Sequence, residues 1–538
     1  MKVATLILRG FLVLPVGLGL GLTVVQGAAH LPQVLAWPGL VRACLLSLGP
    51  GMAAAVISLA LVGLILGASP RSLGLLERLL APLLALPHAA AALGLAFVIA
   101  PSGWIARILS PWATGWRVPP DLMMLNDPWG LALTLGLVLK EAPFLLIMGL
   151  AATTHALRQR QRVAATLGYG RVMGFALVVW PSLYAALRLP VLAVLVYGMT
   201  TVDMALILGP SLPYSLSAQI SLWQSAASLT QQDQAAAAAL LQAGLVGLAL
   251  ILWRGLEVSG AALRQRLTLA GIRAPWADRA LAGVAKGASL GLIVVPVLGL
   301  AGLAIWSIAG LWRFPQALPD QITLQAWAEA GPALLQASAT SVALGFGVTA
   351  AALGLTLWAL QAEDAASRRD GLLFLPLIVP QIVALPGIAT ALLHLPLALT
   401  PMVAVALGHG IYVLPYVVLG LSGPFRGWNP HLGQIGASLG AGPWRVLTRL
   451  RLPMLAGPLA ATAAVGFAVS IGQYLPTLLL GGGRIVTLTT EAVALSSGGN
   501  RRIVGAYALA QAFWPGLAFG LAILLSRVRA LPFGKRSS

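Results

Sequence analysis

Residues 434–453 read QIGASLGAGPWRVLTRLRLP, and residues 162–181 read RVAATLGYGRVMGFALVVWP. The two stretches start 272 positions apart and share one spacing of small residues, glycine, an aliphatic residue and proline. The matching positions are Ala164, Ala165, Gly168, Val178 and Pro181 in the first stretch, and Gly436, Ala437, Gly440, Leu450 and Pro453 in the second. Pro143 and Pro415 obey the same offset. Similarity at a fixed offset indicates that two homologous halves are joined end to end.

The composition indicates a membrane protein. Of the 538 residues, 59% are hydrophobic and only 9% are charged, whereas about a quarter of the residues of a soluble globular domain are charged. The net charge of +19 would also suit a nucleic-acid-binding protein. Because the basic residues are dispersed over the loops between apolar segments, we attribute them to topology and to contact with anionic lipid, and we expect no nucleic-acid partner.

Apolar runs of about 20 residues can each cross the bilayer as a helix. In the first half they lie near 8–29, 43–67, 79–100, 131–153, 183–208 and 236–254. In the second half they lie near 287–309, 333–360, 372–395, 398–421, 455–480 and 503–526. The sequence therefore predicts an all-α, polytopic membrane protein of about twelve membrane helices, six in each half.

The chain divides at a charged interruption between the two sets of helices. We expect the first half over residues 1–255, a cytoplasmic linker over 256–286, and the second half over 287–538. A run after Pro82 matches a run after Pro376 at an offset of about 294, which has fallen to 272 at the motifs. About twenty extra residues are therefore expected in the loop 101–130 of the first half.

The distribution of Lys and Arg sets the expected orientation, since basic residues near helix ends are retained on the cytoplasmic side. Arg158 and Arg160 precede the first motif and Arg171 lies within it, while Arg445 and Arg449 lie within the second. This places both motifs and both termini in the cytoplasm.

The second motif resembles the cytoplasmic "EAA" loop of type I ABC-importer permeases, which has an acidic residue, two alanines, a glycine four positions later and an aliphatic-x-leucine-proline ending. The chain is similar to the fused permeases of the ferric-iron and thiamine uptake class. The resemblance implies that loops 158–181 and 430–453 form coupling helices that dock on ATP-hydrolysing subunits. The residues it assigns to coupling are Arg162, Ala164, Ala165, Gly168, Pro181, Gln434, Gly436, Ala437, Gly440 and Pro453.

Two features qualify this assignment. The acidic position of the consensus is Arg162 in one copy and Gln434 in the other, so an acidic contact to the ATPase is not expected. Small residues near the membrane surface also permit helix packing alone, which is the alternative to a docking role.

The expected partners follow from what the chain lacks and from the resemblance. No GxxxxGK[ST] phosphate-binding loop occurs in the sequence, so we expect cytosolic ABC ATPase subunits, in two copies, as separate chains. The resemblance implies a periplasmic solute-binding protein, a bacterial inner-membrane location and no enzymatic activity of the chain itself. We expect no cofactor and no metal site.

Ionisable side chains inside the membrane are costly and point to function. Lys140 and Glu141 lie mid-way along the fourth expected helix and Asp203 in the outer half of the fifth, while Gln473 occupies a position comparable to that of Asp203. These residues either line the translocation pathway, or Lys140 pairs with Glu141 or Asp203 and holds helices together. Both interpretations stay open at this stage.

The resemblance favours thiamine or a related organic cation as the solute, with ferric iron next and polyamine or sulfate behind. A proton-coupled secondary transporter is the alternative of another class, because such proteins also often have twelve helices in two halves. The paired cytoplasmic motif argues against that alternative.

Overall fold

The computed structural model describes residues 2–68, 73–153, 155–362, 371–394 and 399–530, and within this part every regular element is a helix. Among these described residues, ten helices are long and apolar enough to cross a membrane, or up to twelve if two bent pairs each count as one span. The bent pairs are Gly371–Ile378 with Gln381–His394, at 98°, and Pro443–Met454 with Ala456–Ile471, at 77°. The predicted all-α polytopic fold is confirmed.

The helices up to residue 269 precede the turn 270–277, and we refer to them as those of the first half. They are α1 (Lys2–Ala28), α2 (Leu31–Leu35), α3 (Leu40–Ala68), α4 (Leu73–Leu84), α5 (His88–Ile99), α6 (Trp104–Leu109), α7 (Leu131–Ala152), α8 (His155–Thr166), α9 (Arg171–Gly174), α10 (Trp180–Thr200), α11 (Asp203–Leu208), α12 (Leu216–Gln224) and α13 (Leu229–Leu269). A π-helical turn over Phe175–Val179 joins α9 to α10.

The remaining helices belong to the second half. They are α14 (Asp278–Ile308), α15 (Gln325–Gln361), α16 (Leu375–Ile378), α17 (Gln381–His394), α18 (Pro401–Arg426), α19 (Pro430–Ser438), α20 (Pro443–Val446), α21 (Leu452–Met454), α22 (Ala456–Ile471), α23 (Leu475–Gly481), α24 (Leu488–Ser496) and α25 (Arg501–Ala530). A second π-helical turn spans Leu447–Arg451, 272 positions after the first. Two short 3₁₀ turns, Pro275–Ala277 and Gly371–Phe374, precede α14 and α16.

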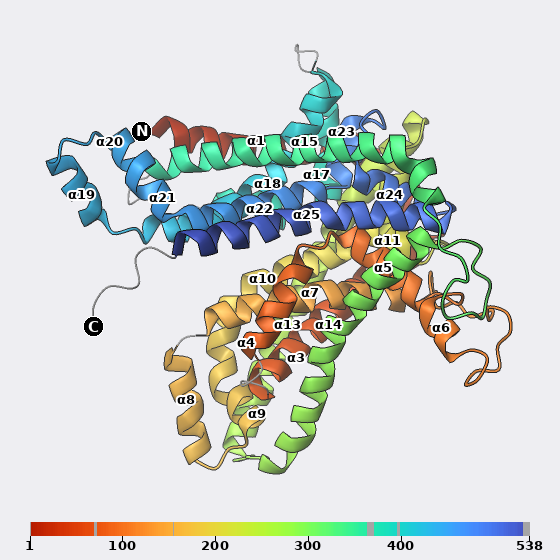
Figure 1. Cartoon of the computed structure of the whole chain (residues 1–538), viewed down its shortest axis with the longest axis horizontal. Coiled ribbons are helices and arrows are strands. Elements are labelled where there is room, and N and C mark those ends of the chain that lie inside the picture. The colour runs from red at the N-terminus through yellow and green to blue at the C-terminus, as the bar shows by residue number, and fades with distance from the viewer. Residues whose placement is uncertain (1, 69–72, 154, 363–370, 395–398, 531–538) are drawn as a thin grey trace.

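The two halves exchange their first helices. In Figure 1, α1 lies in the arm that carries α19, and α14 lies in the arm that carries α8. Helix α1 packs against α17, where a Cβ atom on Gly19 would collide with the Ala384 carbonyl oxygen. Helix α14 packs against α5 at Gly94 and Gly299. A Cβ atom on Gly299 would lie 3.0 Å from the carbonyl carbon of Gly94. Because only glycine permits such close backbone approach, these residues fix both crossings.

Equivalent polar contacts recur in the two halves. The Leu216 amide donates to Ser47 Oγ at 3.0 Å, and the Leu488 amide donates to Ser341 Oγ at 2.9 Å. The serines are 294 positions apart and the leucines 272. The first half therefore contains extra residues between its serine and its leucine. They lie between α5 and α7, which are separated by residues 100–130, whereas α17 and α18 of the second half are separated only by residues 395–400.

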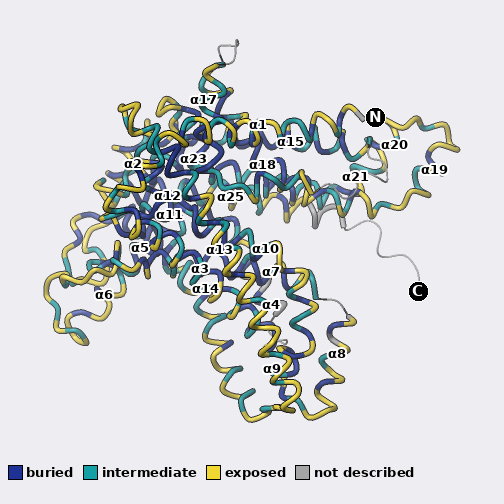
Figure 2. The backbone as a smooth tube through the Cα atoms, turned by 180° about the vertical axis from the view of Figure 1, so that it is seen from behind, coloured by how far each residue is buried: buried dark blue, intermediate teal, exposed yellow. Residues whose placement is uncertain are grey.

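Apolar surface covers the outside of the long helices. Val25, Ile251 and Phe346 are 75%, 70% and 72% exposed, whereas Figure 2 shows buried residues concentrated where the two arms meet. This distribution suits a lipid-facing exterior, since lipid tails solvate apolar side chains.

The segment 256–286, expected to be a linker, is helical over most of its length. Helix α13 runs on to Leu269 and α14 begins at Asp278, so only residues 270–277 lie between the two long helices. Figure 1 places this turn beside α9, at the free end of the first arm.

Candidate functional site

The first loop, residues 158–181, begins with α8 and turns sharply at its end. The Tyr169 amide donates to the Ala164 carbonyl at 3.2 Å and the Gly168 amide donates to the Ala165 carbonyl at 3.0 Å. Gly168 has φ +81°, which glycine adopts without strain. This bond pattern with a left-handed glycine is a Schellman cap, so α8 ends in a tight turn shortly after Ala164 and Ala165.

The second loop, residues 430–453, has the same geometry 272 positions later. The Ala441 amide donates to the Gly436 carbonyl at 2.9 Å, the Gly440 amide donates to the Ala437 carbonyl at 3.0 Å, and Gly440 has φ +79°. In both loops the chain then passes through its π-helical turn to a proline in the first turn of a helix, Pro181 or Pro453. Each proline closely follows the π-helical turn, where the regular i→i−4 bonding of the helix is already altered, so its missing amide hydrogen is accommodated there.

The small residues of the two motifs do not all face outward. Ala164 and Gly436 are buried, and a Cβ atom on Gly436 would lie 3.1 Å from Leu450 Cδ1. Ala165 and Ala437 are exposed. The first small residue therefore lets α8 or α19 lie against its own following helix, and only the second is available to a partner.

Larger apolar side chains on these short helices are exposed and were missing from the expected coupling residues. Val163 and Leu167 are each 59% exposed on α8 and the turn after it, and their counterparts Ile435 and Leu439 are 56% and 82% exposed. Their spacing of four places each pair on one helix face. Apolar residues on both sides of the small pair were the sequence signal that could have identified them.

The position that is acidic in the consensus is exposed in both copies. Arg162 and Gln434 face outward, and Gln434 Oε1 lies 3.1 Å from His431 Nδ1. A hollow of about 410 Å³ lies along α8, with Gln159, Val163 and Leu167 among its lining residues. The outward face of the first loop is thus an apolar concavity edged by polar and basic side chains.

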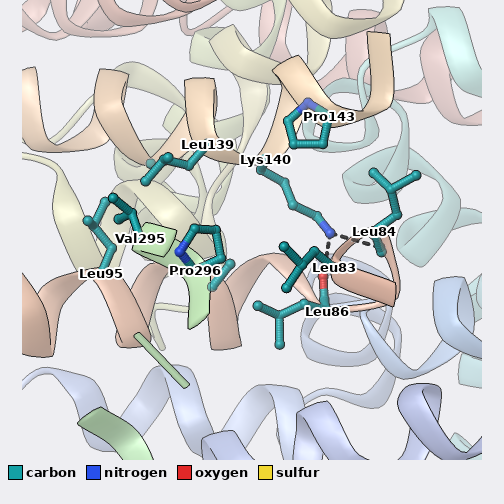
Figure 3. A pocket seen from close by; sticks show the side chains of 11 residues that line it. Leu83, Leu84, Leu86, Leu95, Leu139, Lys140, Pro143, Val295 and Pro296 are labelled. Atoms are coloured by element: carbon teal, nitrogen blue, oxygen red, sulfur yellow. Dashed lines mark hydrogen bonds between the residues drawn. The ribbon is translucent and has the colours of Figure 1, made fainter. Parts of the chain in front are cut away.

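Lys140 does not pair with either carboxylate in the described part of the chain. Its ammonium donates to the Leu84 carbonyl at 2.9 Å and also to the Leu86 carbonyl, at the end of α4 (Figure 3). Glu141 instead lies 3.4 Å from His88 Nε2, and Asp203 accepts a hydrogen bond from Thr201 Oγ1 at 2.9 Å. The described residues thus show no direct bond from Lys140 to Glu141 or Asp203, although the charges of Lys140 and Glu141 attract each other. The choice between a pathway role and a helix-holding ion pair stays a prediction.

Asp203 and Gln473 lie at corresponding helix breaks. Asp203 begins α11 directly after α10 ends at Thr200, and Gln473 lies between α22 and α23. Gln473 Oε1 accepts from Gln381 Nε2 at 3.3 Å. Gln381 begins α17 as His88 begins α5, each directly after a proline. These two corresponding places therefore carry ionisable groups, His88 and Asp203, in the first half and amides, Gln381 and Gln473, in the second.

Aromatic side chains from both halves adjoin the carboxylates. The His88 ring lies 4.7 Å from the Tyr197 ring, centroid to centroid. Asp203 interacts electrostatically with Tyr197 and Tyr474, and Glu141 with Tyr197 and Tyr416. We call His88, Glu141, Tyr197, Asp203, Tyr416 and Tyr474 the polar cluster.

The polar cluster lies between the halves. Its residues come from α5, α7, α10 and α11 of the first half and from α18 and the start of α23 of the second. The Lys140 ammonium donates to carbonyls at the end of α4 and, in the described part of the chain, to none of the cluster's carboxylates. His88 and the tyrosines were not among the expected pathway residues, because nothing in their sequence spacing relates helices so far apart.

Curated proteins of known type match most of the chain. It is 32% identical over 450 residues to the inner membrane ABC transporter permease protein YnjC of Escherichia coli, covering 83% of this chain and 80% of the relative. It is 27% identical to the thiamine transport system permease protein ThiP of Escherichia coli, covering 78% of this chain and 76% of the relative.

A third permease is similar to a short part of the chain. The molybdenum transport system permease protein ModB of Mycobacterium bovis is 35% identical over 81 residues, which is 15% of this chain and 31% of the relative. No protein-family model matches the chain, and no solved structure matches it. The extent of the first match is decisive: this chain belongs to the inner-membrane permease subunits of ABC transporters, and is a transport subunit and not an enzyme.

Proposed function

We propose that the first and second loops dock α8 and α19 onto two cytosolic ATPase subunits, and that the chain moves a small organic cation, thiamine in the first place, from a periplasmic solute-binding protein into the cytoplasm. The single observation that carries the docking role is the matched geometry of the two loops: identical caps, and exposed apolar pairs Val163 with Leu167 and Ile435 with Leu439.

Two matched docking helices suit two ATPase copies, one for each half. An amphipathic helix that offers apolar residues at i and i+4 fits a groove on a partner. The start of α1 and the end of α25 lie toward the same end of the molecule as α19 in Figure 1, which supports placing both termini in the cytoplasm with the loops. We also propose that the two permease halves comprise residues 1–255 and 287–538, joined by residues 256–286.

The polar cluster supports a cationic solute. Glu141 and Asp203 are each 7% exposed, and each interacts electrostatically with tyrosines of both halves. Carboxylates attract a cation, and aromatic faces add cation–π attraction. Within a membrane, such groups are costly to maintain unless they serve a pathway. We therefore assign Glu141 and Asp203 to the pathway, with Gln473 at its second-half side, and we give Lys140 a structural role at the end of α4.

The relatives named for thiamine transport favour thiamine within this class, although YnjC names no solute. An oxyanion such as sulfate would be repelled by the two carboxylates, whereas ferric iron and polyamines share the positive charge. The test is uptake by proteoliposomes that contain the permease, its ATPase and its binding protein. Thiamine uptake that is competed by unlabelled thiamine and not by spermidine or ferric citrate is expected. Uptake of a solute of another class, without measurable uptake of thiamine, would refute the substrate assignment.

A further inference from the structure

The turn between α13 and α14 is bonded to the first loop. We call residues 270–278 the connector. The Gly170 amide donates to the Arg273 carbonyl at 2.8 Å, and the Asp278 carboxylate accepts from the amides of Val172, at 3.1 Å, and Arg171. Three successive amides at the start of α9 are therefore held by the connector.

The contact at Gly170 is close as well as polar. A Cβ atom there would lie 2.9 Å from both the Ala274 carbonyl oxygen and Pro275 Cα, and 3.0 Å from Asp278 Oδ1. Such distances require backbone to move. The connector and the first loop are thus packed without space for a methyl group.

The second loop lacks this support within the described residues. Gly442, the counterpart of Gly170, has no atom within 4 Å of its would-be Cβ. Pro443 replaces Arg171 and has no amide to be capped. The two loops therefore share their internal turn and differ in what holds them.

The bond to Asp278 continues into a helix that contacts both halves. Asp278 is the first residue of α14, which packs against α3, α5 and α7 of the first half and against α25 of the second. A displacement of α9 is passed through Asp278 to α14, because two charge-assisted hydrogen bonds join them.

We propose that Asp278 is a positioning residue that locks the first loop to α14, so that this loop and the connector move as one body while the second loop moves with its own half alone. The two ATPase-coupling loops are consequently unequal. This inference rests on the proposed coupling function for its consequence in transport, but the lock itself is a property of the chain alone.

The lock is tested first without any partner, by hydrogen exchange of the complete permease in nanodiscs. Asp278→Ala is expected to speed exchange of the Arg171 and Val172 amides about tenfold, the factor that loss of an ordinary helix cap gives. Gly170→Ala displaces the connector by another route and is the second variant if Asp278→Ala does not fold. Gly442→Ala is the matched comparison and is expected to change exchange in its own loop far less. Unchanged exchange at residues 170–172 in both Asp278→Ala and Gly170→Ala would overturn the lock.

The functional consequence is measured as ATP hydrolysed per solute taken up, in proteoliposomes with ATPase and binding protein. Asp278→Ala is expected to raise this ratio at least about twofold, and Asp278→Glu, which keeps the carboxylate, to restore most of the coupling. A general loss of stability lowers uptake and hydrolysis together and leaves the ratio unchanged. An unchanged ratio with faster exchange would overturn the unequal coupling and leave the contact as packing only. Absence of solute-stimulated hydrolysis in the unaltered chain would instead count against the proposed function.

Discussion

Replacing Gly440 by alanine tests whether the left-handed turn of the second loop is needed for docking. Gly440 has φ +79°, and no atom lies within 4 Å of the Cβ that alanine would add. The cost is therefore purely conformational, about 1–2 kcal/mol for an L-residue in this region. Because that free energy corresponds to about a 5- to 30-fold change in an equilibrium, the population of the seated turn should fall by this factor.

The assay is titration of the nanodisc-embedded permease with its labelled ATPase. We expect the dissociation constant for Gly440→Ala to rise about 5- to 30-fold. Gly440→Asn should cost less, since asparagine tolerates the left-handed region. Gly442→Ala is the control, because Gly442 has φ −66° and open space around it. Equal affinities for Gly440→Ala and Gly442→Ala would refute the claim that the capped turn presents α19 to the ATPase.

Three further predictions concern packing and the pathway. Gly19→Ala should lower the thermal transition clearly more than Gly17→Ala, because only Gly19 contacts the backbone of another helix; equal shifts would contradict the helix-crossing argument. Asp203→Asn should reduce cation uptake with the fold retained, and adding Lys140→Met should not restore it, since Lys140 bonds carbonyls of α4 and not Asp203; rescue would restore the ion-pair interpretation. Arg107→Met should make the segments 100–130 and 309–324 more sensitive to proteolysis, because Arg107 donates to the carbonyls of residues 102, 312, 313 and 316. An unaltered digestion pattern would contradict this.

The repeat was the part of the fold most open to prediction. An offset of 272 read from the sequence reappears as left-handed φ angles of +81° at Gly168 and +79° at Gly440, and as two π-helical turns in register. Special residues such as glycine and proline carry their backbone geometry with them, so a shared spacing implies a shared turn.

Helix breaks and helix exchange lay beyond the sequence. The runs 183–208 and 455–480 are continuous by hydropathy, yet the chain breaks within them, next to Asp203 and at Gln473. Hydropathy measures only how favourably a segment transfers into lipid and does not predict where the backbone bends. The pairing of α1 with α17 depends on a backbone contact at Gly19, which no spacing within either half encodes.

The direction of individual side chains was the least predictable feature of the site. Lys140 and Glu141 are neighbours in sequence but bond to α4 and α5 respectively. Ala164 and Ala165 look equivalent in the motif, although the first is buried and the second exposed. Such differences arise from a rotation of about 100° per helical residue relative to packing partners that are distant in the chain.

The central claim is that both α8 and α19 touch the ATPase, and site-directed photo-cross-linking tests it most directly. A photoreactive residue is placed at Leu167, at Leu439 or, as the control, at Trp112, which is 77% exposed in the loop inserted between α5 and α7. Illumination of the assembled complex should yield permease–ATPase adducts from positions 167 and 439 and none from 112. Adducts from neither motif position, in a complex that still purifies with its ATPase, would contradict the account.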